Sequence, residues 1–594
     1  MLKGIYFPVE VWYLIAENLH AEDWINLRAT NSQLYLIFSA NELWKPLVIE
    51  TWYKYTHHQD TVKDQYWLGL YYKHVNADRV LRNKLHSLEN LQHQPGSQVW
   101  NVLSPVFEDP DLYVPELVRL SQHLNTSYLK NGAYHKADFD NLLTSRLNNL
   151  RCIYLASSVL RAIRLCKMFQ YEFDYFRRET DNENFETLED MLMHFSYIDP
   201  FFYEFYEYRE RTLKSVEKAY RELELDNTVS NTAKVKQLAS LLQEQLYRNS
   251  MAKTPFQTEQ TRYRFCEDFC LLRVYAGDVI GAPECIHAIM HKLCDTVDIP
   301  VRVNKANFIV EDPTVRGGTS HFIIYSYKTV QINIDEILNT SSPSIVNIYR
   351  SYITCKELKL HVASLFFEAF SLNPRIPSTI HPQALNDDEL HVSALGDRIQ
   401  GQILGFYCAD DFSVRIFTRF WSIRMRNWNT RPRIFDTGLV SVFFLSNQIA
   451  FLSIGLITVS SKYQELAMLY EDLKDMISKQ SGRCISMDMA HGDANKFTEN
   501  RYESFEAGQL VLHRGIQPLL VLGFDSSEKP ESCRCMKLTG GIFISLPRNL
   551  VPFCYDSSEF DAAVKQFAIY DELGAYFTKF DEKTKRFILI NNES

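Results

Sequence analysis

The first fifty residues carry apolar side chains at helical spacing. Pro8 stands where a helix would begin, because its fixed φ suits a first helical turn. Three short helices are predicted, followed by a further apolar run; the apolar positions are Val11, Leu14, Ile15, Leu19, Trp24, Leu27, Leu34, Ile37, Phe38, Trp44, Leu47, Val48 and Trp52. So small a unit has too little interior to bury them all. We therefore expect a surplus apolar surface that a second protein, or the rest of the chain, covers.

The helical pattern continues to about residue 225. Aromatic residues at helical spacing between Phe195 and Tyr208 predict core packing rather than a cofactor site. Alternating charges over Arg209–Leu225 are typical of an exposed helix face.

After Phe265 the pattern becomes mixed, with a helix predicted over Glu284–Val297. β-rich segments are predicted over Val301–Val310, Phe322–Tyr327 and Val330–Ile334. Helices resume from about Ile345 to Lys479, and a polar linker follows. From Phe505, short β-type runs separated by Gly and Pro predict a small barrel-like domain. The expected fold is therefore multidomain α+β, with three N-terminal helices and a mainly helical middle that contains one α+β domain.

One uncharged stretch, Leu439–Val459, is long enough to cross a bilayer. Asn447 and Gln448 lie near its centre, where polar amides are costly in hydrocarbon. Two buried segments that break near Ser446 are therefore the favoured interpretation, and a membrane span is the alternative.

Length and charge narrow the classes of protein further. A chain of 594 residues should hold several domains, because single cores rarely grow so large. The net charge of −10 argues against bulk nucleic-acid binding. Twelve scattered cysteines, with no signal-peptide pattern at Met1, favour reduced thiols and a cytoplasmic or nuclear location.

A candidate catalytic set consists of Cys285, His321 and Asp335. Cys285 lies in the first turn of a helix that Pro283 begins, and a helix N-terminus lowers a thiol pKa. His321 could then accept the thiol proton while Asp335 orients the imidazole. The alternative, which we favour, is a buried packing cysteine, a structural histidine and a turn-forming aspartate.

Metal binding has weaker support in the sequence. His287 and His291 are four residues apart on the same predicted helix, but no third ligand completes a site. The short cysteine pairs, Cys266 with Cys270 and Cys533 with Cys535, have no matching second pair. We expect no metal and no cofactor.

The N-terminal stretch resembles the F-box. The matching positions are Pro8, Glu10, Ile15, Leu19, Asp23, Leu27, Leu34, Phe38 and Trp44, with Phe7 in place of the usual Leu. The resemblance implies docking onto the Skp adaptor of a cullin-based ubiquitin ligase. The residues expected to carry that contact are Pro8, Val9, Leu14, Ile15, Leu27, Leu34 and Trp44.

The region around Cys285 resembles a SirB-type transglutaminase-like domain. The similar segments are Gly281–Ala282–Pro283, Asp298–Ile299–Pro300, Ser320–His321–Phe322 and Ile334–Asp335. Cys285 stands where that branch usually has Ser, and Ser320 where it has Gly. The branch is generally regarded as non-catalytic, so the resemblance implies a fold rather than a reaction.

The C-terminal region resembles the YccV/HspQ domain, also called hemimethylated-DNA-binding. The similar segments are Phe505–Glu506–Ala507–Gly508–Gln509, Val511–Leu512–His513, Gly523–Phe524–Asp525 and Asn549–Leu550. Residues 501–594 contain eleven Lys and Arg against thirteen Asp and Glu, whereas phosphate binding needs a basic surface. A protein-interaction role is therefore favoured over DNA binding.

Together with Glu572–Phe577, this order of modules resembles the F-box only protein 21 family. The implied organisation is an F-box (1–52), a helical linker region (53–184), a SirB-type domain (185–374), a helical extension (375–480), a linker (481–503) and a YccV/HspQ-like domain (504–594). The implied function is that of a non-catalytic receptor that recruits unknown protein substrates to an SCF-type ubiquitin ligase, with no membrane partner. A thiol hydrolase or acyltransferase that uses Cys285, His321 and Asp335 is one alternative, and a non-degradative scaffold is another.

Overall fold

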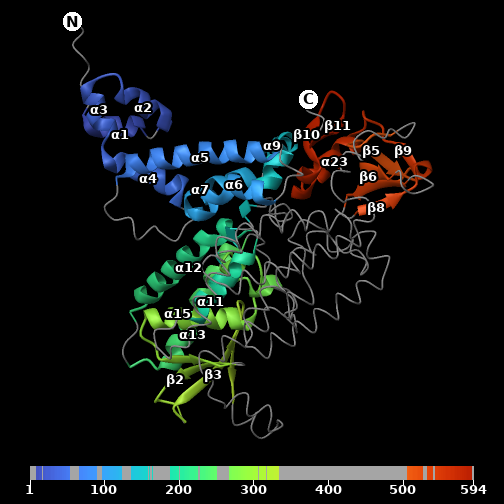
Figure 1. The fold of residues 1–594 in the computed structure, drawn as a ribbon. Helices are drawn as coiled ribbons and strands as arrows, with labels where there is room; N and C mark the ends of the chain where they lie inside the picture. The colour runs from blue at the N-terminus through green and yellow to red at the C-terminus, as the bar shows by residue number, and fades with distance from the viewer. Residues whose placement is uncertain are drawn as a thin grey trace.

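A computed structural model describes most of both ends of the chain and much of its middle. The described residues are 8–16, 18–53, 66–89, 96–122, 136–157, 159–160, 163–164, 167, 187–199, 201–224, 228–250, 266–304, 307–315, 317–333, 505–525, 532–538 and 542–590. Asp335, the extension 375–480 with its uncharged stretch 439–459, and the linker 481–503 lie outside them. The described part is mixed α+β, with a helical N-terminal region and small antiparallel sheets, which confirms the coarse fold class (Figure 1). Among the described helices, none has both the length and the apolar character needed to cross a bilayer.

Four short helices open the chain and share a core with the start of a fifth helix. They are α1 (Val9–Ala16), α2 (Ala21–Arg28), α3 (Ser32–Phe38) and α4 (Asn41–Thr51). We call these helices, together with Trp52 and residues 66–71 of the chain, the N-terminal module. Asn31 begins α3 because its side chain accepts a hydrogen bond from the Leu34 N–H group at 2.9 Å. The module has its own buried hydrophobic cluster, separate from the main core.

A long helix connects this module to the rest of the molecule. Helix α5 (Trp67–Glu89) runs from the N-terminal module toward the C-terminal strands (Figure 1). It packs against α6 (Gly96–Glu108) and α7 (Pro110–Ser121). Helix α9 (Lys136–Asn148) and the helical residues 150–157 follow.

The middle of the chain is a bundle of helices over a small sheet. The helical elements are α11 (Leu188–Phe195), η3 (Ser196–Ile198), α12 (Phe202–Glu222), α13 (Asn231–Asn249), η4 (Cys266–Phe269), α14 (Leu271–Tyr275) and α15 (Pro283–Thr296). The aromatic residues at the start of α12 are buried, as their spacing predicts. Helix α15 forms within one residue of the range that the sequence predicts at each end.

The sheet of this region is a four-stranded antiparallel meander. Its strands, in spatial as well as chain order, are β1 (Val301–Val303), β2 (Phe308–Glu311), β3 (Thr319–Ile324) and β4 (Thr329–Ile332). The stretch that we predict to be β-rich, residues 301–310, is confirmed as β structure and forms two strands, β1 and β2. Val301 pairs with Val310 across the resulting hairpin, so both halves keep their β-type residues in the sheet.

The C-terminal region contains a five-stranded sheet, as the β-type runs predict, but no barrel closes within the described residues, in contrast to the barrel-like domain that we predict. The order is β8-β7-β6-β5-β9, and the outer strands β8 and β9 do not pair with each other within the described residues. The strands are β5 (Leu510–His513), β6 (Gln517–Asp525), β7 (Ser532–Lys537), β8 (Ile542–Ser545) and β9 (Leu550–Pro552). Alternate residues of these strands join two different hydrophobic clusters, so both faces are covered.

Short elements complete the C-terminal region. They are η7 (Pro547–Asn549), α23 (Ser558–Phe567), η8 (Asp571–Ala575) and the hairpin of β10 (Phe577–Asp581) and β11 (Arg586–Leu589). Gly508 joins this hairpin to the sheet, since its carbonyl accepts a hydrogen bond from the Phe587 N–H group at 2.9 Å. Its φ is 84°, and an added Cβ would lie 1.9 Å from the Phe587 carbonyl oxygen, so the position requires glycine.

The C-terminal region is attached to α9 and the helical turns that follow it. The buried guanidinium of Arg146 forms an ion pair with Asp571 and donates to the Ala568 carbonyl oxygen at 2.9 Å. Arg151 donates to the Gly574 carbonyl oxygen at 3.1 Å. An added Cβ at Gly574 would lie 2.0 Å from the Leu150 carbonyl oxygen, so the two backbones are in direct contact. Residues more than 400 positions apart in the sequence therefore form one continuous core.

Candidate functional site

Indole rings build the core of the N-terminal module. The rings of Trp24 and Trp44 meet edge to face with centroids 5.1 Å apart, and Trp44 lies 4.7 Å from the ring of Tyr71. The Trp44 indole N–H group donates to the Phe38 carbonyl oxygen at 2.7 Å, which satisfies its only polar group. The core therefore extends past residue 52 into α5, because Tyr71 belongs to the same cluster.

Trp44 is a correction to the predicted adaptor-contacting set. Its side chain is 0% exposed, so it cannot touch a partner while the module keeps its core. A late Trp in the sequence pattern marks the interior of this unit, not its surface. Among the other predicted residues, Pro8 and Leu14 are exposed, and Ile15, Leu27 and Leu34 are partly buried; the Val9 side chain lies outside the described part of the chain.

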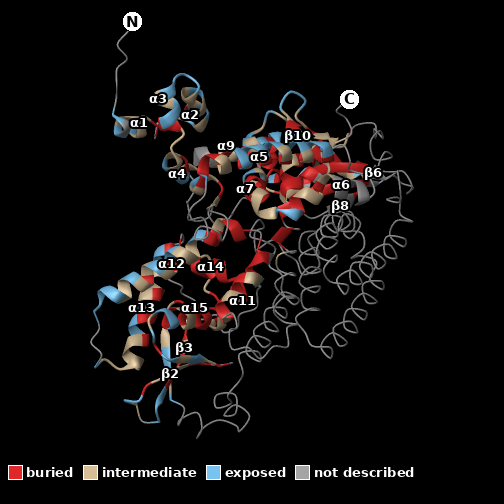
Figure 2. Cartoon of the chain, turned by 60° about the vertical axis from the view of Figure 1, so that its left-hand side comes forward, coloured by how far each residue is buried: buried red, intermediate tan, exposed pale blue. Residues whose placement is uncertain are grey.

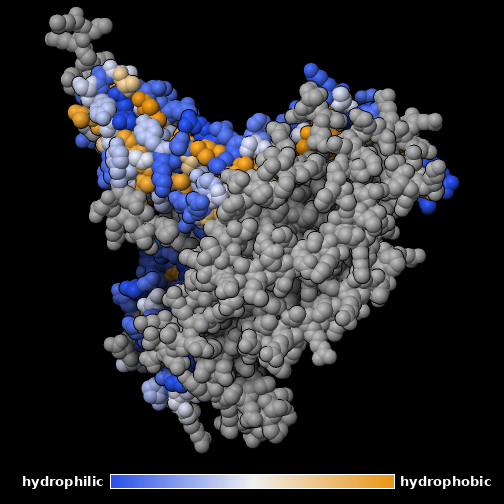
Figure 3. Space-filling view, viewed as in Figure 1, coloured by the Kyte–Doolittle hydropathy of each residue, from blue (hydrophilic) through white to orange (hydrophobic). Residues whose placement is uncertain are grey.

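Three large apolar side chains of α1 and α3 face solvent. Leu14 is 62% exposed, Tyr35 is 51% exposed and Leu36 is 71% exposed. Figure 3 shows hydrophobic residues among hydrophilic ones at the surface of this end of the molecule, and Figure 2 shows exposed positions on the same short helices. We call Leu14, Tyr35 and Leu36 the exposed apolar set. Such side chains on a folded module are candidates for a protein-binding surface.

Tyr35 and Leu36 are not among the residues that the sequence predicts to contact a partner. A signal was present, because residues 34–38 are apolar all the way round a helix of seven residues. A helix that is apolar on every side can bury only the stripe that faces its own core. Ile37 and Phe38 occupy the buried stripe, so Tyr35 and Leu36 remain exposed to solvent.

Polar contacts hold the N-terminal module against the helices that follow. The Trp52 indole N–H group donates to Asp78 Oδ2 at 3.1 Å, and Arg119 Nη2 lies 2.6 Å from the same oxygen. Arg119 and Arg82 both pair with the buried carboxylate of Glu116, at 2.8 and 2.5 Å. Burial raises the pKa of Glu116, although the hydrogen bond from Arg82 opposes that shift. The module is thus fixed to α5 and α7 through charges that are partly removed from solvent.

Cys285 lies in the first turn of α15, as predicted, but in the core. Its side chain is 0% exposed, and its Sγ lies 3.7 Å from the Asp268 carbonyl oxygen. Burial raises the thiol pKa well above its usual value, and the negative charges of Glu284 and Asp268 raise it further. The thiol is therefore held neutral, because these effects exceed any stabilisation by the helix N-terminus.

His321 lies on the face of the sheet opposite to α15. Successive strand residues point to opposite faces, and the neighbours of His321 in β3, Ser320 and Phe322, point toward α13 and α15. His321 instead contacts Asn307, whose amide nitrogen donates to its Nδ1 at 2.7 Å. Burial lowers the pKa of His321. The structure does not bring the imidazole to the thiol, and Asp335 lies outside the described residues.

The histidine that does face the sheet from α15 is His287. Its Nε2 accepts a hydrogen bond from the Ile324 N–H group at 3.1 Å, and burial lowers its pKa to about 3. The Nδ1 of His291 lies 3.1 Å from Asp295 Oδ2. The two imidazoles thus have separate partners, and no cluster of three or more metal-ligand side chains occurs in the described ranges.

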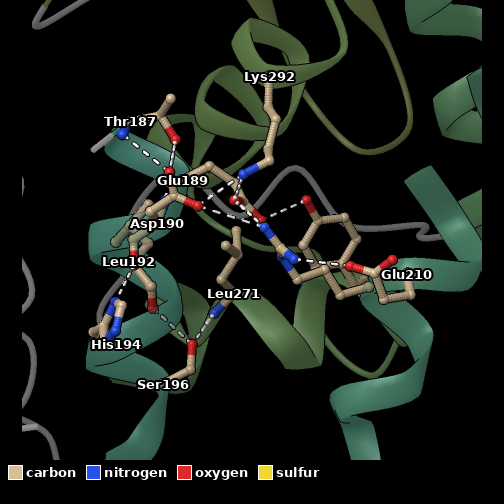
Figure 4. A network of polar contacts seen from close by, with 11 residues as sticks. Thr187, Glu189, Asp190, Leu192, His194, Ser196, Glu210, Leu271 and Lys292 are labelled. Carbon is tan, nitrogen blue, oxygen red and sulfur yellow. Dashed lines mark hydrogen bonds and ion pairs between the residues drawn. The ribbon is translucent and has the colours of Figure 1, made fainter. Parts of the chain in front are cut away.

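A buried polar network ties α11, α12, α14 and α15 together (Figure 4). The fully buried carboxylate of Glu189 accepts two hydrogen bonds from Arg209, at 2.7 and 2.8 Å, and one from the Tyr275 hydroxyl at 2.9 Å. Lys292 Nζ lies 3.0 Å from Glu189 Oε2 and 2.7 Å from Asp190 Oδ1. The carboxylate therefore has a donor on each of the three other helices.

The pKa values in this network follow from its charges. Burial opposes ionisation of Asp190, but hydrogen bonds from Lys292 and Thr187 outweigh it and lower the pKa of Asp190 to about 2. Burial disfavours the charged form of Arg209, yet its bonds to Glu189 raise its pKa. Arg209 belongs to the stretch that we predict to be an exposed helix face, and this part of the prediction is wrong. The network stabilises charges inside the protein, with the fully buried carboxylate of Glu189 at its centre.

The fold and these two regions define a mixed α+β protein with an exposed apolar N-terminal module and a helix–sheet core. No protein-family model, curated protein or solved structure matches the chain.

Proposed function

We propose that the chain is the substrate-recognition subunit of an SCF-type ubiquitin ligase. In this proposal the N-terminal module binds a Skp adaptor, which connects the chain to a cullin scaffold. The remaining regions hold a protein substrate near the ubiquitin-loaded partner, so the receptor contributes proximity and forms no covalent intermediate.

The observation that carries the proposal is the exposed apolar set of a module with its own core. Aromatic packing around Trp44 gives α1–α4 a fixed shape, while Leu14 and Leu36 remain mostly in solvent. Apolar side chains on a rigid surface are suited to act as binding anchors, because little ordering is needed on association. The resemblance of residues 7–44 to the F-box supports the Skp adaptor as the proposed partner.

The proposal predicts which residues carry the adaptor contact. Leu14→Ser with Leu36→Ser should abolish co-purification of the purified Skp adaptor with the full chain, because both anchors are lost. Far-UV circular dichroism should stay unchanged, since neither side chain is buried. A matched control is Val330→Ser, which removes an apolar side chain of 40% exposure from β4 and should leave adaptor binding intact.

Adaptor binding that persists in the double variant would contradict the assignment of these helices. The thiol-enzyme alternative has less support, because Cys285 is buried and neutral and His321 lies on the other face of the sheet.

A further inference from the structure

The turn between β5 and β6 presents an unusually exposed apolar side chain. Ile516 is 84% exposed, more than any other large hydrophobic residue in the described ranges. Arg514 and Gly515 both have positive φ, 51° and 73°, and the Ile516 N–H group donates to the His513 carbonyl oxygen at 3.1 Å. This is the sign pattern of a type I′ turn, which matches the twist of paired strands.

The turn is held rigidly at one end of the sheet. The Arg514 N–H group donates to the Asn549 carbonyl oxygen at 2.7 Å, which fixes the turn against η7 and β9. Arg514 adopts a left-handed conformation without being glycine, and such strain persists only where the surroundings impose it. Ile516 is therefore exposed on a turn whose backbone is held in place.

Two arginines and a second aliphatic residue lie beside this turn. Arg548 precedes Asn549, and Val551 is 45% exposed on the edge strand β9. Arg514 and Arg548 are both exposed, and neither guanidinium forms an ion pair within the part of the chain that the structure describes. We call Arg514, Ile516, Arg548 and Val551 the hairpin surface.

We propose that the hairpin surface binds an extended acidic protein segment that carries an aliphatic side chain. The planar guanidinium groups suit carboxylates, with which arginine forms paired hydrogen bonds. Ile516 and Val551 add exposed apolar side chains for contact with an aliphatic residue. Among the described strands β9 is an edge of the sheet, and addition of an extended chain to such an edge is a common mode of peptide recognition.

A nucleic acid fits the same surface less well. The C-terminal region has more acidic than basic residues, and a phosphate backbone requires a broad basic surface. Two arginines do not provide such a surface, and exposed aliphatic side chains give phosphates no favourable contact. The combination of aliphatic residues and arginines that form no ion pair with any described residue favours a protein segment.

Under the proposed function, on which this assignment rests, the bound segment belongs to the substrate. The sheet with β5 and β9 lies at the opposite end of the described molecule from the N-terminal module (Figure 1). Adaptor and substrate would then occupy separate surfaces. The binding property itself does not require the adaptor, so the two proposals can fail independently.

The test is selection from a random twelve-residue peptide library displayed on phage, with the immobilised full chain as bait. The enriched peptides should combine Asp or Glu with Ile, Leu or Val. Ile516→Ser and Arg548→Glu should each weaken binding of the enriched peptides by about tenfold or more, the size of effect seen at interface hot spots. Matched controls are Val330→Ser and Lys583→Glu, which change an exposed aliphatic residue and an exposed cation elsewhere.

Three outcomes would overturn the inference. They are no enrichment, enriched peptides without acidic residues, and equal binding to the hairpin variants and the controls. Displacement of the peptides by a short DNA duplex would assign the surface to nucleic acid instead. The Skp adaptor should bind all four variants normally. Failed selection with normal adaptor binding would refute only this inference, whereas successful selection without adaptor binding would refute only the proposed function.

Discussion

The N-terminal module and the α11–α15 region differ in how far their candidate functional residues are exposed to solvent. In the N-terminal module the aromatic core is buried, but Leu14 and Leu36 stay in solvent. Around α15, the residues that suggest chemistry are buried, and Cys285 is held as a neutral thiol. The candidate residues of the first region are therefore accessible to a partner, whereas those of the second region belong to the protein core.

The difference shows how burial changes the meaning of a motif. A leucine that the fold leaves outside can bind a partner, whereas a cysteine that the fold buries packs like a small apolar residue. The charged side chains of Arg209 and Lys292 near α15 pair with Glu189, and this network joins the helices to one another. This supports a scaffold role for the middle region and a binding role for the N-terminal one.

The largest expected effect is the loss of the buried carboxylate. Glu189→Ala leaves Arg209 and Lys292 without their shared acceptor, and should lower the free energy of unfolding by about 3–5 kcal/mol. Urea unfolding of the full chain measures this change. A matched control is Glu217→Ala, which removes a carboxylate paired with Arg221 at the exposed surface of α12 and should cost at most about 1 kcal/mol. Equal costs for the two variants would contradict the scaffold role of the network.

Truncation of the N-terminal core should have a similarly large but local effect. Trp44→Ala removes a fully buried indole and should destabilise the module by about 3–5 kcal/mol. Hydrogen exchange in residues 32–52 would report the loss. Leu36→Ala, on the exposed side of the same module, should change stability by less than about 0.5 kcal/mol. If Leu36→Ala destabilised the module as much as Trp44→Ala, Leu36 would be part of the core.

Acid should weaken the attachment of the N-terminal module to α5. His74 is buried and stacks on Trp52 with ring centroids 5.1 Å apart. Burial lowers its pKa to about 4; Asp78 and Asp109 oppose this shift, and Lys73 adds to it. Because the folded pKa lies below the unfolded value, the unfolded state binds the proton first as pH falls.

Stability should therefore be intact above about pH 6.5 and fall by at most about 1.4 kcal/mol per unit down to pH 4. Hydrogen exchange across residues 67–78 at several pH values measures the effect. His74→Gln should flatten the profile in this segment. An unchanged profile in that variant would show that another group titrates there.

The smallest expected effect is a difference in the rate at which two cysteine thiols are alkylated, and it involves no change in stability. Cys554 is exposed, whereas Cys285 is fully buried with a raised pKa. Iodoacetamide at neutral pH should therefore modify Cys554 first and leave Cys285 unmodified in the folded chain, as read by mass spectrometry of peptides. Faster modification of Cys285 would revive the thiol-enzyme hypothesis.

The sequence predicted the positions of helices and strands better than it predicted how these helices and strands pack and pair with one another. The periodicity of α15 and the buried aromatic residues of α12 were correct, because regular spacing reflects one buried face. The β-rich stretch 301–310 was also correct, although the sequence did not predict its division into β1 and β2, since no Gly or Pro separates the two strands. The C-terminal sheet was correctly predicted as β structure but not as open, because strand closure depends on long-range pairing.

For the candidate site, the sequence indicated the helices of the N-terminal module but not which of their apolar residues are exposed. Trp44 and Leu36 look equally apolar in the sequence, and only packing decides that one is buried and the other exposed. Arg209 has charged neighbours in the sequence, yet its partner Glu189 lies twenty residues away on another helix. Such pairing depends on tertiary contacts, which no local pattern encodes.

The most direct test of the central claim is a hydrogen-exchange footprint of a purified Skp adaptor on the full chain. The account predicts that binding slows exchange in α1 (Val9–Ala16) and α3 (Ser32–Phe38), while α15 (Pro283–Thr296) keeps its free-state rates. Unchanged exchange in α1 and α3 at saturating adaptor, or protection confined to other helices, would contradict it.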